Sequence, residues 1–167
     1  MFIIERINAL RQSRRYRLGA ESGIPPRLVR QAHNDTRDAL RTMYLLGFPI
    51  FRTQFVFILE RTRIGAFPDG ETRYCCGSSR NNDQADVDEA DINLGSIRAF
   101  LASDRNPGNL TLEQELRKTI IHELAHSAYR AHHGDSTDPF IPPANSRQDY
   151  LQRESERFAF DLETRLA

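Results

Sequence analysis

Hydrophobic residues follow two different periods along this chain, and they predict helices at both ends with a sheet between them. Apolar positions three and four apart predict a helix near the N-terminus, a second over 26–46 that is ended by Gly47, and another over 148–166. A run rich in Phe, Val and Ile predicts a buried strand over 51–59, and alternation predicts a short half-exposed strand over 90–94. This mixture of elements indicates an α+β fold.

Turn residues and polar runs divide the central part of the chain. The Pro-Asp-Gly turn at 68–70 leads into a predicted strand over 72–76, which forms a hairpin with the strand at 51–59. The polar, acidic segment 77–89 is predicted to be a loop. With 167 residues the chain is expected to form a single domain. Its predicted parts are a helical N-terminal part over 1–47, a sheet part over 48–95 and two functional helices over 110–167.

The stretch between Lys118 and Arg130 is mostly apolar and contains no Lys or Arg, which predicts a helix buried on most of its faces. It carries the sequence H-E-L-A-H. His122 and His126 are four residues apart, so they lie on one helix face and can direct their imidazoles at one point. Glu123 is rotated by about 100°, so it can reach a water on a shared metal ion without binding the ion. These residues predict a hydrolytic zinc centre with Glu123 as general base.

Hydrolytic zinc usually takes a third protein ligand, and Glu154 is the leading candidate. Leu151 and Phe158, seven residues apart, mark the apolar face of the predicted C-terminal helix, and Glu154 falls between them. A carboxylate on a stripe that faces the core is costly unless it is paired or bound to a metal. Glu156 is rotated by roughly 200° from Glu154, onto the face of Glu163, and is predicted to be solvated.

Other residues are alternative candidates for the third ligand. His132 extends the motif to H-E-x-x-H-x-x-Y-x-x-H, which is close to the metzincin pattern. However, Tyr129 stands where that pattern has Gly, and no Met follows the motif to form a Met-turn. A carboxylate soon after the helix, as in aspzincins, and an upstream Cys, as in peptide deformylases, are the other options. These residues are Asp135, Asp138, Cys75 and Cys76.

The H-E-L-A-H motif, followed by E-S-E-R-F-A at 154–159, resembles the ImmA/IrrE-type minimal metallopeptidases, which pair H-E-L-x-H with a later E-A-x-x-F-A helix. Small H-E-x-x-H proteases used as secreted toxins or effectors are similar. The resemblance implies a single-domain, gluzincin-like zincin fold with N-terminal helices, a small twisted and mostly antiparallel sheet, an active-site helix and a ligand helix. It implies Zn²⁺ held by His122, His126 and Glu154, and it places 91–94 as the rim strand that holds the substrate backbone.

The predicted reaction is hydrolysis of a peptide bond in a protein substrate, with Glu123 moving a proton from water to the leaving amine. Asp161 is the candidate acceptor that orients a ligand imidazole. Tyr150 is the candidate donor to the oxyanion, and Tyr129 or an Arg is the alternative. Two other functions stay open: a zinc amidase or deformylase-like hydrolase that depends on the cysteines, and a non-enzymatic binding module with a structural metal site.

Charge adds little about partners, since 23 basic and 23 acidic residues give a net charge of zero. This balance points to neither nucleic acid nor an anionic membrane. Basic residues do gather near the N-terminus, which leaves an anionic partner open, although a solvated helix face is the simpler interpretation. They are Arg6, Arg11, Arg14, Arg15 and Arg17. Lys118 is the only Lys, a bias expected of a GC-rich genome or of a protein delivered into a host cell.

The two cysteines are neighbours in sequence, so no disulfide framework is expected and a reducing compartment is indicated. The apolar start at 1–4 is too short for a signal peptide. No apolar run approaches the about 20 residues that span a membrane. We therefore expect a cytoplasmic protein, or one that is exported without a cleaved signal.

Overall fold

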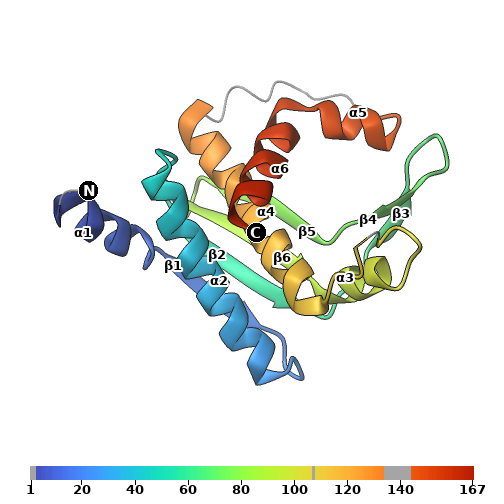
Figure 1. The fold of residues 1–167 in the computed structure, drawn as a ribbon, viewed down its shortest axis with the longest axis horizontal. Coiled ribbons are helices and arrows are strands. Elements are labelled where there is room, and N and C mark those ends of the chain that lie inside the picture. The colour runs from blue at the N-terminus through green and yellow to red at the C-terminus, as the bar shows by residue number, and fades with distance from the viewer. Residues whose placement is uncertain (1–2, 107, 134–143) are drawn as a thin grey trace.

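The computed structural model describes residues 3–106, 108–133 and 144–167, and it shows helices packed against a small sheet (Figure 1). The α+β class predicted from the sequence is confirmed. In chain order the elements are α1 (Ile3–Gln12), β1 (Tyr16–Ala20), α2 (Pro26–Leu45), β2 (Thr53–Leu59), β3 (Ile64–Ala66), β4 (Thr72–Tyr74), β5 (Gly77–Asn82), β6 (Val87–Asn93), α3 (Leu94–Leu101), α4 (Leu112–His133), α5 (Arg147–Gln152) and α6 (Glu154–Leu166).

The larger sheet has the strand order β1-β2-β6-β5, and it is mixed rather than mostly antiparallel. β1 pairs in parallel with β2, and β2 pairs in parallel with β6, while β5 runs antiparallel to β6. The prediction of a mostly antiparallel sheet is wrong, because β1 was not predicted and because β2 and β6 run parallel to each other. The chain returns from β1 to β2 through α2, and such a crossover makes the two strands parallel. β4 pairs with β3 in a separate hairpin, and not with β2 as predicted.

β5 and β6 differ most from the predicted strands. β5 lies inside the segment 77–89 that was predicted to be a loop, and it forms one edge of the sheet. β6 lies between β2 and β5, so residues 90–93 are buried and not half-exposed. The placement of 91–94 as the rim strand is therefore wrong. Polar residues are tolerated on β5 because an edge strand is paired on one side only, and this is why hydrophobic periodicity did not reveal it.

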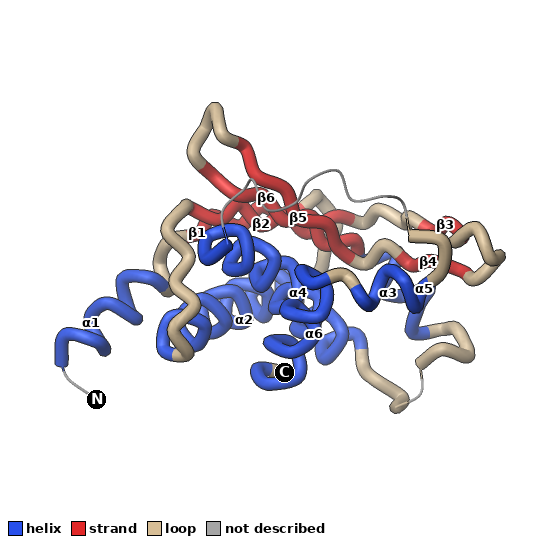
Figure 2. Tube along the Cα trace, turned by 90° about the horizontal axis from the view of Figure 1, so that it is seen from above, coloured by secondary structure: helices blue, strands red, loops and turns tan. Residues whose placement is uncertain are grey.

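α4 lies in the middle of the helical layer, between α2 and α6, and the sheet lies above it in Figure 2. Apolar side chains from these helices and from the inward faces of β2 and β6 form the core. They include Leu28, Leu40, Met43, Val56, Ile58, Ile92, Leu116, Ile120, Leu124 and Leu162. Because α4 is enclosed in this way, the directions of its remaining side chains are fixed by packing.

The two predicted N-terminal helices are both present. α1 packs on α2 and leaves Ile3 and Ile4 exposed. α2 begins with Pro26 in its first turn, where a missing N–H costs nothing, and it is followed by Gly47 with φ 86°. In the part of the chain that the structure describes, no helix combines the length and the apolar composition needed to cross a membrane.

The predicted C-terminal helix over 148–166 is in fact two helices. α5 ends at Gln152 and α6 begins at Glu154, and Arg153 between them has φ −59° and ψ 136°. This backbone conformation is extended, so it interrupts the helical rotation and resets which side chains face inward. The buried residues of α6 are Glu156, Ala159 and Leu162.

Candidate metal centre

α4 begins at a capping box and then continues without interruption through the core. The Thr111 hydroxyl accepts a hydrogen bond from the backbone N–H of Gln114 at 3.2 Å, and the Gln114 side chain accepts one from the Thr111 N–H at 2.8 Å. The helix extends to His133, and the apolar residues around its motif are almost fully buried. The predicted buried helix with H-E-L-A-H is therefore confirmed, and it presents His122 and His126 to α6.

Two nitrogens of α4 and a carboxylate of α6 meet at one point. His122 Nε2 lies 3.2 Å from His126 Nε2 and 3.2 Å from Glu156 Oε2, while His126 Nε2 lies 3.4 Å from Glu156 Oε1. Ligand atoms about 2.0–2.1 Å from a tetrahedral zinc ion are separated by roughly 3.3 Å, so the observed spacing fits such an ion. Two His and one Glu also form one of the ligand sets that occur in catalytic zinc sites.

The same contacts shift the pKa values of His122 and Glu156 in opposite directions, so that the charged forms of both are favoured. Burial opposes the charged form of His122, but hydrogen bonds to Glu156 and Glu163 raise its pKa to about 10. Burial likewise opposes the charged form of Glu156, yet hydrogen bonds with His122 and His126 hold the pKa of that carboxyl far below its usual range. A proton and a metal ion thus compete for this centre, because a metal binds only the neutral imidazole.

Glu163 lies two turns after Glu156 on α6 and supports the opposite side of the His122 ring. Its Oε2 is 3.2 Å from His122 Nδ1, and its Oε1 is 3.1 Å from Lys118 Nζ. A carboxylate that accepts the Nδ1–H leaves the Nε2 lone pair directed at the centre, as in metal-binding histidines. The prediction of Asp161 for this role is wrong, because Asp161 is exposed and forms an ion pair with Arg165 at 3.0 Å.

Glu154 is exposed, so the prediction that it completes the group with the two histidines is wrong. That prediction assumed that Leu151 and Phe158 mark one face of a continuous helix. Leu151 belongs to α5, and the break between α5 and α6 removes the assumed relation between the two positions. Glu156, which was predicted to be solvated, contacts both histidines, and Glu163 on the same helix contacts His122.

Glu123 is buried beside this group, and it packs against the first residue of β5. A Cβ atom added at Gly77 would lie 2.6 Å from Cγ and 2.8 Å from Cδ of Glu123, so the absence of a side chain at Gly77 makes room for the carboxylate. Burial raises the pKa of Glu123, which makes its carboxylate a stronger proton acceptor. Glu123 therefore borders the three candidate ligands without being one of them.

Tyr150 is close to the centre, as the sequence predicted. Its hydroxyl donates a hydrogen bond to the Glu156 carboxylate. Burial raises the pKa of the Tyr150 phenol, so the group remains protonated and can donate. Tyr129, the alternative, is buried in an aromatic cluster instead. Its ring lies 4.1 Å from the ring of His133 and 5.5 Å from the ring of Phe158.

None of the alternative third ligands that the structure describes belongs to this group. His132 is exposed near the end of α4. Cys75 and Cys76 border the adjacent cavity, and burial raises the pKa of Cys76 to about 12, which disfavours the thiolate form that binds metals. Asp135 and Asp138 lie outside the described residues.

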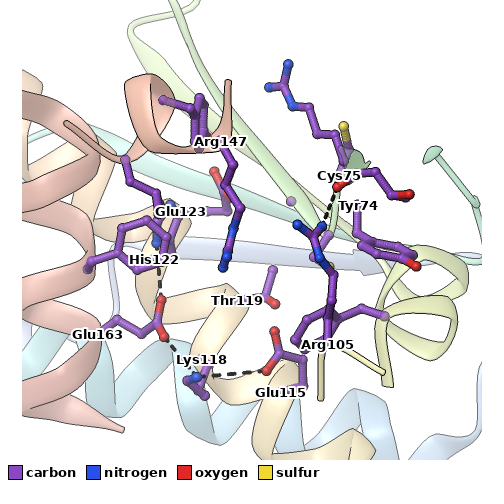
Figure 3. A pocket seen from close by; sticks show the side chains of 18 of the residues that line it. Tyr74, Cys75, Arg105, Glu115, Lys118, Thr119, His122, Glu123, Arg147 and Glu163 are labelled. Carbon is purple, nitrogen blue, oxygen red and sulfur yellow. Dashed lines mark hydrogen bonds and ion pairs between the residues drawn. The ribbon is translucent and has the colours of Figure 1, made fainter. Parts of the chain in front are cut away.

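A cavity of about 280 Å³ opens beside His122 and Glu123 (Figure 3). The segment from β4 to β5 lines one side, and α4, α5 and α6 line the other. The wall is both aromatic and cationic: its rings belong to Phe67, Tyr74, Phe100, Tyr150 and Phe160, and its cations are Arg73, Arg105, Lys118 and Arg147. A substrate group in this cavity would lie next to the candidate metal centre.

Comparisons of this chain with protein-family models, with curated proteins and with solved structures found no match. The resemblance to minimal metallopeptidases consequently remains a prediction from the two sequence motifs. Conclusions about function therefore depend on the geometry of the centre itself.

Proposed function

We propose that this protein is a zinc-dependent peptidase. The observation that supports the proposal most strongly is the meeting of His122 Nε2, His126 Nε2 and the two oxygens of the Glu156 carboxylate, with contacts of 3.2–3.4 Å. These distances and ligand types suit a zinc ion that keeps one position free for water or substrate. The adjacent cavity supplies the space for such a substrate.

Each residue around the centre has a distinct proposed role. His122, His126 and Glu156 hold the ion, and Glu163 orients the His122 ring through Nδ1. Zinc in such a site lowers the pKa of water to about 7 and polarises a carbonyl group. Glu123 accepts the proton of the attacking water and returns it to the leaving amine. The Tyr150 hydroxyl is the candidate donor to the negative charge that develops on the carbonyl oxygen.

The proposed substrate is a peptide because β5 offers an unpaired strand edge next to Glu123. Within the described sheet β5 pairs only with β6, which leaves backbone N–H and C=O groups on its outer side. An extended peptide can pair with such an edge, and backbone pairing is a common mode of peptide recognition. Gly77 contacts Glu123 at the start of this strand, so a peptide paired there would run past the proposed base.

Metal analysis combined with peptide cleavage tests the proposal. We expect about one zinc per chain after dialysis in both the wild type and Glu123→Gln, and cleavage of a proteome-derived peptide mixture by the wild type only. The glutamine keeps the size of the side chain but accepts no proton, so metal binding and catalysis separate. Absence of zinc from the wild type, or equal cleavage by the Glu123→Gln protein, would contradict the proposal.

A further inference from the structure

The cations of the cavity wall differ in whether a protein group already neutralises them. Lys118 lies 3.1 Å from Glu163 and 4.0 Å from Glu115, and Arg105 forms an ion pair with Glu71. These cations therefore have carboxylate partners within the protein. Lys118 and Arg105 line the cavity, but their positive charge is largely neutralised.

Arg73 and Arg147 have no carboxylate partner among the described residues, but their surroundings differ. The guanidinium carbon of Arg73 lies 5.7 Å from the ring centre of Phe67 and 5.1 Å from that of Tyr150, so this cation is covered by two aromatic faces. Arg147 has neither an ion pair nor a ring contact in the described part of the chain. Its side chain extends from α5 into the cavity (Figure 3).

The carboxylates of the wall leave the Arg147 charge unmatched. Glu115 and Glu163 both face Lys118, and Glu123 packs against Gly77. A guanidinium in a cavity has five donors and favours a carboxylate, which it can bind with two parallel hydrogen bonds. The rings of Tyr74, Phe100 and Phe160 provide apolar surface for the methylene groups that carry such a carboxylate.

We infer that this cavity is the specificity subsite of the proposed peptidase, and that Arg147 selects substrates with a carboxylate next to the scissile bond. The inference depends on the proposed function and names its substrate class. A volume of about 280 Å³ is just below the range for small-molecule sites, about 300–1,000 Å³, and suits one side chain. The carboxylate belongs either to an Asp or Glu side chain or to the end of the substrate chain.

Cleavage of a proteome-derived peptide mixture by the zinc-loaded protein tests this inference, with mass spectrometry of the products. In the wild type, Asp and Glu should exceed Asn and Gln by about tenfold or more at one position beside the cut bond. Arg147→Gln should abolish that preference and still cut peptides without acidic residues. Arg147 is exposed, so its replacement should leave the fold intact. Arg157→Gln is the matched control, since Arg157 is exposed on α6 and does not line this cavity.

Synthetic peptides separate the two sources of the carboxylate. Peptides with an amidated C-terminus and Glu, Gln, Phe or Lys beside the scissile bond should be cut fastest with Glu if the side chain is recognised. If only free C-termini support cleavage, Arg147 recognises the chain end, and the Arg147→Gln protein should lose that requirement. An unchanged preference in Arg147→Gln, or a wild-type preference for Phe, overturns the inference but not the peptidase. No cleavage by the wild type beyond that of Glu123→Gln overturns the peptidase as well.

Discussion

α4 and α6 contribute to the same centre in different ways. α4 supplies two histidines from one uninterrupted helix of 22 residues, so their relation depends only on the spacing within the helix. α6 supplies Glu156 from its first turn, directly after the extended residue Arg153. The direction of Glu156 therefore depends on where a helix begins. Spacing within a helix can be read from a sequence, whereas a helix start without a capping side chain is much harder to locate.

The strongest test of this contrast compares substitutions of Glu156 and Glu154, two acidic residues in the first turn of α6. We expect Glu156→Gln to weaken zinc binding by more than the about 10- to 100-fold loss that outer-shell substitutions cause, because it removes a direct ligand. Glu154→Gln changes the same charge on an exposed side chain and should leave affinity unchanged. Competition with a chromogenic chelator measures both constants. The opposite ranking would show that α5 and α6 form one helix with the predicted phase.

Gly77→Ala tests whether the sheet positions the base that α4 carries. The added Cβ collides with Cγ and Cδ of Glu123, so the carboxylate must move. A misplacement of about 1 Å in a catalytic group lowers the rate by roughly 100-fold. We expect such a loss in kcat with about one zinc per chain retained. Gly65→Ala is the control, because a Cβ at Gly65 meets no atom within 4 Å. Full activity of Gly77→Ala would show that Glu123 needs no fixed position.

Glu163→Gln examines the second contribution of α6. The amide accepts the His122 Nδ1–H less strongly than the carboxylate does and loses the ion pair with Lys118. We expect zinc affinity to fall by about 10- to 100-fold. Asp161→Asn, an equal change of charge on the exposed side of α6, should have no effect. Equal affinities for the two variants would remove Glu163 from the centre.

The smallest expected effect concerns Glu115 of α4 and its dependence on pH. Burial raises the pKa of Glu115 to about 7, although Lys118 opposes the shift. The folded state thus retains a proton that the unfolded chain loses near pH 4.5, so this contribution to stability is complete at lower pH and is lost as pH rises through about 7. The cavity is open to solvent, so we expect about 1–2 kcal/mol after screening.

Urea unfolding at pH 5 and pH 8 measures this contribution. Glu115→Gln should gain stability relative to the wild type between the two pH values. Glu113→Gln, which removes a partly exposed charge two residues earlier that faces Arg27, should show no such gain. A pH-independent difference between Glu115→Gln and the wild type would contradict the buried ionisation.

The sequence predicted the parts of the molecule whose cause is local. The buried motif helix depends on the apolar residues around His122 and on spacing within one helix, and both are visible in the chain. The phase of α6 was wrong because nothing in the sequence of Arg153 marks a break, and its side chain makes no capping hydrogen bond. One signal was available, since Glu156 and Glu163 are seven residues apart and share a face with Ala159 and Leu162.

The sheet shows the same division between local and non-local causes. β2 was predicted because its sequence is rich in Phe, Val and Ile, and in the structure its residues alternate between buried and half-buried positions. β5 was missed because its polar sequence, Gly77–Asn82, becomes a strand only by pairing with β6. Parallel or antiparallel pairing is likewise decided by connections between distant segments, which hydrophobic periodicity does not record.

Lys118 has a practical consequence for following this centre in solution. It is the only lysine in the chain, and its ammonium group contacts Glu163, which in turn contacts His122. Reagents that acylate amines therefore have a single side-chain target, and that target is linked to a candidate metal ligand. The rate of acylation at Lys118 can be followed in the one proteolytic peptide that contains it and compared with the rate at the α-amino group. A change in this ratio would show a change in the contacts of Glu163 and His122.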